Sequence, residues 1–264
     1  MSYVFVDTHC HFDFPPFTGH EKESLALAAQ AGVQQIIVPA VTADRFASLL
    51  KLAGDHLPLF AALGLHPLYI VQHHDQQLDQ LADFLASRPA KLVAVGEIGL
   101  DLYMADPQFV RQQTLLKQQL TLAKRHDLPV ILHSRRSHDQ LAAALRRADV
   151  PRRGVVHGFA GSLAQAQAFI RLGYSIGVGG TISYERAQKT RGVMAQLPLG
   201  SLLLETDAPD MPLAGYQGQP NRPERAAEVF KILCQLRPEP PDEIADSLQQ
   251  NAQSLFALPS PVAA

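Results

Sequence analysis

The chain has 264 residues, 47% of them hydrophobic, and a formal net charge of -2 at pH 7. This length suits one (β/α)8 barrel and is sufficient for a full hydrophobic core. The near-neutral charge excludes a general attraction to polyanions, so any contact with nucleic acid has to come from a local group of basic side chains.

Short apolar segments alternate with longer amphipathic ones along the chain, which is typical of βα units around a parallel sheet. Strands are predicted, in chain order, at Tyr3–Val6, Gln35–Pro39, Leu59–Gly64, Leu92–Glu97, Val130–His133, Gly154–His157, Tyr174–Val178 and Ser201–Glu205. Apolar residues at three- and four-residue spacing predict helices at Lys22–Ala31, Gln76–Ser87, Gln108–His126, His138–Arg147, Leu163–Leu172, Glu185–Gln196, Pro223–Leu236 and Asp242–Phe256. No linker or repeat divides the chain, so we expect a single domain over residues 1–264.

The placement of polar residues decides between two folds that share this alternation, a TIM barrel and a doubly wound open sheet. Histidines and carboxylates lie at or just after the C-terminal ends of five of the eight predicted strands. In a TIM barrel these ends converge on one mouth, where active sites are built. We therefore expect an α/β fold, a TIM (β/α)8 barrel.

The first polar group is His9-Cys10-His11, directly after the first strand. In an extended segment, alternate side chains point to the same side, so His9 and His11 can bind one cation together. An isolated His-x-His pair is common by chance. The interpretation depends on the other strand ends.

Four further strands deliver one candidate metal ligand each, in apolar surroundings. Glu97 follows an uncharged apolar run, and a buried carboxylate there needs a cation or a raised pKa. Single imidazoles end the next two strands, at His133 and His157, and Asp207 follows the last strand. Each alone could be a hydrogen-bonded structural residue.

Four imidazoles and two carboxylates exceed the needs of one tetrahedral cation but suit two cations that share a carboxylate. We expect two divalent metal ions with Glu97 as the bridge. His9, His11 and Asp207 are expected on one ion, and His133 and His157 on the other. Mixed nitrogen and oxygen donors suit Zn or Mn and tolerate Mg, so the identity of the metal stays open.

Several stretches resemble the ordered motifs of the TatD family of metal-dependent deoxyribonucleases, within the amidohydrolase superfamily. They run, in single letters, FVDTHCH from Phe5, ALGLHP from Ala62, VGEIGLD from Val95, LPVILHSR from Leu128, HGF from His157 and LETDAP from Leu204. The resemblance covers nearly the whole chain. It implies a TIM barrel, a divalent-metal site at the positions above, and phosphodiester hydrolysis on DNA; some similar proteins cleave ester bonds of aminoacyl-tRNA.

Several residues near the ligands have candidate roles in catalysis or substrate binding. Asp207 is expected to be both a ligand and the general base, whereas Glu205 is expected to hydrogen-bond a ligand rather than take part in the chemistry. The guanidinium of Arg135, two residues beyond His133, suits a phosphate oxygen pair, with a surface ion pair as its alternative. His66 could contact substrate or shape its turn, and Asp101 and Tyr103 could line the pocket or cap a helix.

Two other function classes remain open: an amidohydrolase or esterase acting on a C–N or ester bond, and a metal-stabilised binding protein without turnover. A closed coordination shell would favour the latter. The two cysteines, Cys10 and Cys234, are far apart, and no apolar run reaches the length of about 18 residues that a membrane span needs. We expect a cytoplasmic protein that contacts nucleic acid, with no membrane association and no obligate protein partner.

Overall fold

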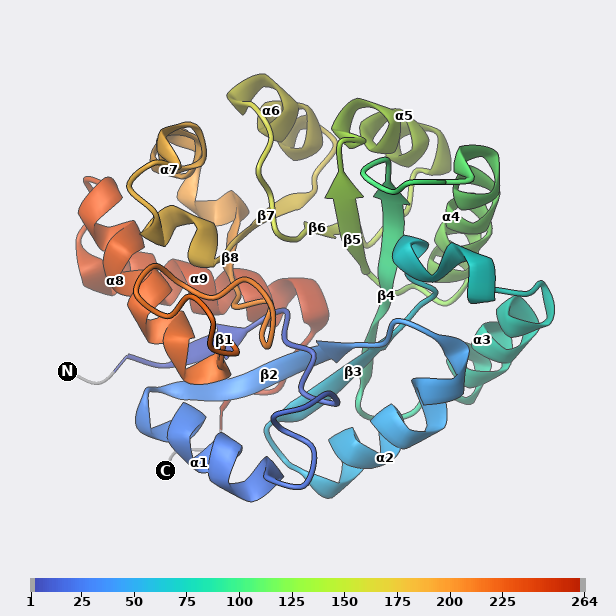
Figure 1. The fold of residues 1–264 in the computed structure, drawn as a ribbon, viewed down its shortest axis with the longest axis horizontal. Helices are drawn as coiled ribbons and strands as arrows, with labels where there is room; N and C mark the ends of the chain where they lie inside the picture. Colours follow the sequence, from blue (N-terminus) through green and yellow to red (C-terminus); the bar gives the residue numbers. More distant parts are fainter. Residues whose placement is uncertain (1–2, 262–264) are drawn as a thin grey trace.

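Eight parallel strands form the centre of the computed structural model, which describes residues 3–261 (Figure 1). Each strand pairs with the next along the chain. Their bounds are β1 (Phe5–Asp7), β2 (Val33–Pro39), β3 (Leu59–Leu63), β4 (Leu92–Asp101), β5 (Val130–Arg135), β6 (Gly154–Val156), β7 (Ser175–Val178) and β8 (Leu202–Leu204).

The sheet closes between the end of β1 and the segment after β8. The backbone N–H of Thr8 donates to the carbonyl of Leu204 at 3.0 Å, and the N–H of Asp207 donates to the carbonyl of His9 at 2.8 Å. The TIM barrel is therefore confirmed over the doubly wound open sheet. Closure also brings together candidate ligands from opposite ends of the chain, His9 and Asp207.

Helices surround the strands, one after each (Figure 1). They are α1 (Glu21–Gln30), α2 (Phe46–Asp55), α3 (Gln76–Ser87), α4 (Phe109–Arg125), α5 (His138–Ala148), α6 (Leu163–Arg171), α7 (Gln188–Gln196) and α8 (Ala226–Leu236), followed by α9 (Pro241–Phe256). No helix range was predicted where α2 lies, although its buried Phe46, Leu49 and Ala53 have helical spacing. None of the helices in the described part of the chain is long and apolar enough to cross a membrane.

The helix α9 closes the N-terminal end of the barrel. Its Phe256 packs in one buried cluster with strand residues such as Ile37 and Ile131. Side chains alternate between the two faces of a strand, so the residues next to Ile37 and Ile131 point the other way and pack in a separate cluster with the surrounding helices. The side-chain amide of Asn251 also donates to the carbonyl of Leu202 at 2.9 Å, at the start of β8. The opposite, C-terminal end of the barrel is therefore the one that can open to solvent.

The strand β4 continues beyond its predicted end. It reaches Asp101, so Glu97 lies within the strand and not at its end. Gly99 pairs in register with His133, and Asp101 with Arg135, because β5 also continues past its predicted end. Sequence periodicity missed both extensions because polar residues interrupt the apolar runs. The extensions place a second acidic side chain, Asp101, beside the candidate ligands.

Candidate metal centre

Glu97 lies at the centre of the candidate site, at the floor of the mouth, and it is almost completely buried. Its Oε2 lies 3.2 Å from His9 Nε2 and 3.4 Å from His11 Nε2. Its Oε1 lies 3.1 Å from His133 Nδ1 and 2.7 Å from His157 Nε2. The barrel thus brings the predicted ligands together. A different pair of predicted imidazole ligands faces each oxygen of one carboxylate, and His66 Nε2 also lies 2.8 Å from Oε1.

Asp207 completes the group on the Oε2 side. Its Oδ1 lies 3.6 Å from His9 Nε2 and 3.8 Å from His11 Nε2. In a tetrahedral site with bonds of about 2.1 Å, ligand atoms are separated by about 3.4 Å. The four distances among these nitrogens and the oxygens of Glu97 and Asp207 lie close to that value. The group therefore has the dimensions of a cation site.

Hydrogen bonds orient two of the imidazoles. His11 Nδ1 donates to the carbonyl of Pro39 at 3.2 Å, so Nε2 is the nitrogen that faces Glu97 and Asp207 and that can bind a cation once its proton is displaced. His133 Nε2 lies 2.8 Å from Asp101 Oδ2, so its Nδ1 faces Glu97. A carboxylate that holds the outer nitrogen of a metal-binding histidine is a common arrangement. Sequence reasoning left Asp101 among pocket or capping residues, although it shares the parity of Glu97 along β4.

His66 is also held against Glu97. The backbone N–H of Leu68 donates to His66 Nδ1 at 3.0 Å, so the proton of the neutral ring lies on Nε2, which donates to Glu97 Oε1 at 2.8 Å. Burial lowers the pKa of His66 to about 4, which keeps the ring neutral at pH 7. His66 therefore shapes its turn and positions the central carboxylate, and it also lines the mouth.

Glu205 lies beside the centre and does not hydrogen-bond a ligand side chain, contrary to our expectation. Its Oε1 accepts from the backbone N–H of Gly158 at 2.6 Å, next to His157. Burial raises the pKa of Glu205 to about 7. Gly177 makes room for this carboxylate, because a Cβ there would lie 2.3 Å from Glu205 Oε2. Glu205 also belongs to one of three groups whose donor atoms lie within 4.8 Å of one another, together with His9 and His157.

A second buried acid, Asp7, was missed by sequence reasoning. It accepts from the backbone N–H of Thr206 at 2.9 Å and from the Thr206 hydroxyl at 2.6 Å, and thereby joins β1 to the segment after β8. Burial raises its pKa to about 8. The available signal was an acid at the end of an apolar strand. Its contacts indicate a structural role, which is to hold the backbone that carries His9.

The donor set fits a divalent cation. Among the described residues, His9 Nε2 and Glu97 Oε2 are buried without a hydrogen-bond partner, and such groups are costly unless something binds them. Burial alone would lower the pKa of His157, but the Glu97 carboxylate outweighs it and raises that pKa to about 10. Protons therefore balance the charge of Glu97 when no cation does. Imidazole and carboxylate donors together suit Zn or Mn.

A cavity of about 360 Å³ lies above the centre and opens the mouth to substrate. Phe14, Leu68 and Tyr69 line it alongside the candidate ligands. On the β4–β5 side, the guanidinium groups of Arg135 and Arg136 each lie 4.1 Å from the centre of the Tyr103 ring. Within the described residues neither arginine forms an ion pair, so the surface ion pair considered for Arg135 is absent and its charge is available to an anion.

Comparisons with known proteins agree with this architecture. The family model described as "TatD related DNase" matches residues 6–257. The metal-dependent hydrolase YjjV of Escherichia coli (strain K12) is 67% identical over 255 residues, covering 97% of this chain and 98% of its own. The 3'-5' ssDNA/RNA exonuclease TatD of Rahnella sp. (strain Y9602) is 32% identical, with 88% and 90% covered. The crystal structure of E. coli YjjV, a TatD homologue, superposes with a TM-score of 0.97 at 66% identity and covers 98% of this chain and all of its own.

Proposed function

The chain belongs to the TatD family of metal-dependent hydrolases, and on that premise we propose that it hydrolyses phosphodiester bonds in DNA with two divalent cations. The observation that carries the proposal is that each oxygen of Glu97 faces its own group of donors. Paired cations that share a carboxylate are typical of enzymes that cleave phosphodiesters. The nuclease activity in the name of the Rahnella relative supports the choice of substrate.

In this proposal, His9, His11 and Asp207 would hold one cation, His133 and His157 would hold the other, and Glu97 would be shared between them. When bound there, cations would lower the pKa of water and stabilise negative charge on the reacting phosphorus centre. Zn or Mn suits the imidazoles best, whereas Mg is tolerated through the carboxylates.

The side chains around the cations bind the substrate and move the proton. Asp207, which borders the cavity with a partly exposed side chain, accepts the proton of the attacking water. Arg135 pairs with a non-bridging phosphate oxygen from the rim of the mouth, where its guanidinium is exposed. His66 holds Glu97 in place and, because it also lines the cavity, is within reach of the substrate.

Two other functions would use the same centre, and the experiment described below distinguishes them from the nuclease. An amide or ester substrate, such as aminoacyl-tRNA, needs the activated water but no phosphate contact at the reacting centre. A metal-stabilised binding protein needs a closed coordination shell. The open cavity over Glu97 and the 19% exposure of the Asp207 side chain favour turnover over the binding protein.

The test compares chelated protein with protein reconstituted with Zn, Mn or Mg, on end-labelled single-stranded DNA, aminoacyl-tRNA and a set of small amides. We expect metal-dependent cleavage of DNA in the parent and its loss in Asp207→Asn. As a matched control, Asp246→Asn changes one exposed acid on α9, at the far end of the barrel, and should retain activity. Cleavage of aminoacyl-tRNA or amides without cleavage of DNA would show an esterase or amidohydrolase in place of the proposed nuclease. No turnover on any substrate would favour the binding protein.

A further inference from the structure

We propose that the groove between α4 and α5 is a second binding site, for the backbone of a single-stranded nucleic acid whose end lies in the metal centre. This inference rests on the proposed function, because it names how the rest of the same substrate is held. The groove lies outside the barrel, shares no residue with the candidate ligands, and has a volume of about 660 Å³.

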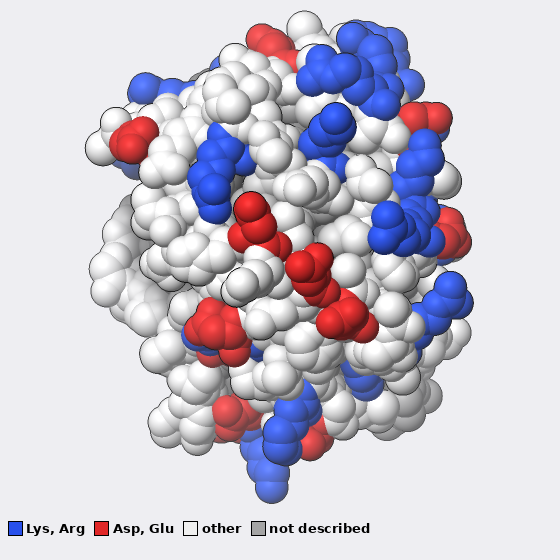
Figure 2. All heavy atoms as spheres, turned by 90° about the vertical axis from the view of Figure 1, so that its right-hand side faces the viewer, with Lys and Arg blue, Asp and Glu red and all other residues white. Residues whose placement is uncertain are grey.

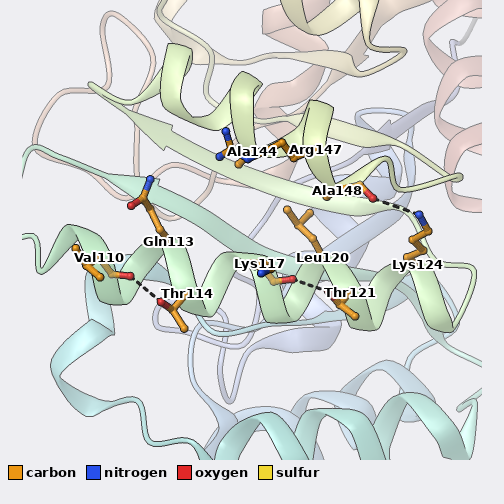
Figure 3. A pocket seen from close by; sticks show the side chains of 10 residues that line it. All are labelled: Val110, Gln113, Thr114, Lys117, Leu120, Thr121, Lys124, Ala144, Arg147 and Ala148. Atoms are coloured by element: carbon orange, nitrogen blue, oxygen red, sulfur yellow. Dashed lines mark hydrogen bonds between the residues drawn. The ribbon is translucent and has the colours of Figure 1, made fainter.

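Small side chains open the groove. Ala144 and Ala148 lie one turn apart on α5 and face the buried Leu120 of α4, so the two helices leave space between them (Figure 3). Longer side chains form the walls. The complete lining is Val110, Gln113, Thr114, Lys117, Leu120, Thr121, Lys124, Ala144, Arg147 and Ala148.

The charge of the groove is entirely positive. Lys117, Lys124 and Arg147 are exposed, and no carboxylate lines the groove. Within the described residues none of the three forms an ion pair with Asp or Glu, and Lys124 Nζ makes only a 3.4 Å contact with the carbonyl of Ala148. Figure 2 shows that basic side chains gather over the upper part of this face, above the acidic ones that cross its middle. Since the whole chain has a net charge of -2, this excess is local.

One end of the groove lies at the same end of the barrel as the mouth. Val110 and Gln113 lie in the first turns of α4, which follows the C-terminal end of β4, and α5 begins just after Arg136. A strand that leaves the metal centre across Arg135 and Arg136 therefore reaches the upper end of the groove.

The cations further down α4 continue the same path. Lys117 and Lys124 lie two helical turns apart, which corresponds to about 10 Å along the groove. A small anion would contact one of these cations, whereas a chain of regularly spaced phosphates can contact several. A positively charged groove that follows a phosphate backbone is typical of proteins that bind single strands.

The test measures binding directly, so that it does not depend on cleavage. Metal-loaded parent, the triple variant Lys117→Gln/Lys124→Gln/Arg147→Gln and the control Lys22→Gln/Lys51→Gln/Lys231→Gln are titrated into fluorescent single-stranded phosphorothioate oligonucleotides, which resist hydrolysis. The control removes the same charge from exposed positions on α1, α2 and α8. One oligonucleotide is a trimer, and the other has about fifteen nucleotides, within the range of known single-strand sites.

We expect the triple variant to bind the long oligonucleotide at least about tenfold more weakly than the parent, and to lower the slope of log K against log salt by about 2, since each lost phosphate contact accounts for about 0.7. The control variant should bind the long oligonucleotide with the same affinity as the parent. All three proteins should bind the trimer with equal affinity. Single variants, each expected to lower the slope by about 0.7, serve if the triple variant misfolds.

Equal affinity of the parent and the triple variant for the long oligonucleotide would overturn the inference. The inference would also be overturned if sedimentation showed a dimeric parent and a monomeric triple variant, since a second copy of the chain would then occupy the groove. A parent that binds the long oligonucleotide through the groove but cleaves no DNA would refute the proposed function and leave the groove in place.

Discussion

Replacement of Glu97 by Gln tests whether one carboxylate serves two cations. The amide of Gln keeps the size of Glu97 but has one neutral oxygen, whereas the carboxylate directs Oε2 at His9 and His11 and Oε1 at His133 and His157. Loss of a residue that merely orients a ligand typically lowers metal affinity 10- to 100-fold. Loss of a shared, charged ligand should exceed the upper end of that range, about 100-fold, at both positions.

The measurement is metal content by elemental analysis after dialysis against a weak chelator, with thermal unfolding recorded on the same samples. His9→Ala is the matched control, because His9 Nε2 lies beside Glu97 Oε2 and Asp207, so its loss should empty mainly one position. We expect less than one equivalent of metal in Glu97→Gln and about one in His9→Ala. Two full equivalents in Glu97→Gln would refute the bridge, and equal loss at both positions in His9→Ala would refute the partition of ligands.

The remaining predictions address the residues around the cations. Asp207→Asn should lower kcat by about 10²- to 10⁴-fold even when added metal restores occupancy, and near-normal turnover in the reloaded variant would show that Asp207 only holds a cation. Arg135→Met should lower kcat/KM on DNA by about one to two orders of magnitude, as expected for a charge-assisted contact of about 1.5 to 3 kcal/mol, while activity on a neutral ester stays unchanged; equal loss on both substrates would argue against a phosphate contact. Asp101→Asn should weaken metal binding about 10- to 100-fold in a competitive titration, because the imidazole that it orients loses its preferred tautomer, and unchanged affinity would remove that role. Metal affinity should rise with pH up to about pH 10, because a cation must displace the protons of His11 and His157. The carboxylate of Glu97 outweighs burial and raises the pKa of His11 to about 9 and that of His157 to about 10. Calorimetry in buffers of different ionisation enthalpy measures the protons released, and none released at pH 7 would contradict the reasoning.

Much of the candidate site was accessible from the sequence because parallel strands impose a simple rule. Each apolar run that ends in a histidine or an acid delivers that side chain to one end of the barrel, so His133 and His157 could be placed together without coordinates. Resemblance to a family added the kind of chemistry. The same rule failed at β4, where the polar Glu97 suggested an end to a strand that continues to Asp101.

The roles of individual side chains depended on contacts that periodicity does not contain. Sequence reasoning could not decide whether His66 shapes a turn or touches substrate, and the geometry shows that its ring shapes the turn and supports Glu97. From the sequence, Asp7 was an acid after the first apolar strand, and Asp101 was a residue after Glu97 that could line the pocket or cap a helix. They became part of the site only when Thr206 and His133 were found beside them.

By itself, the sequence determined that the chain folds as alternating strands and helices and that imidazoles and carboxylates gather at one end of the barrel, because both follow from local periodicity and from the direction of the strands. Only the tertiary structure decided which oxygen of Glu97 faces which imidazole pair, which ring nitrogen remains free to bind a cation, and where α4 and α5 leave a basic groove. These properties depend on distances of a few ångströms between residues far apart in the chain. Such distances are set by closure of the barrel and by packing of the helices against it, which no local pattern records.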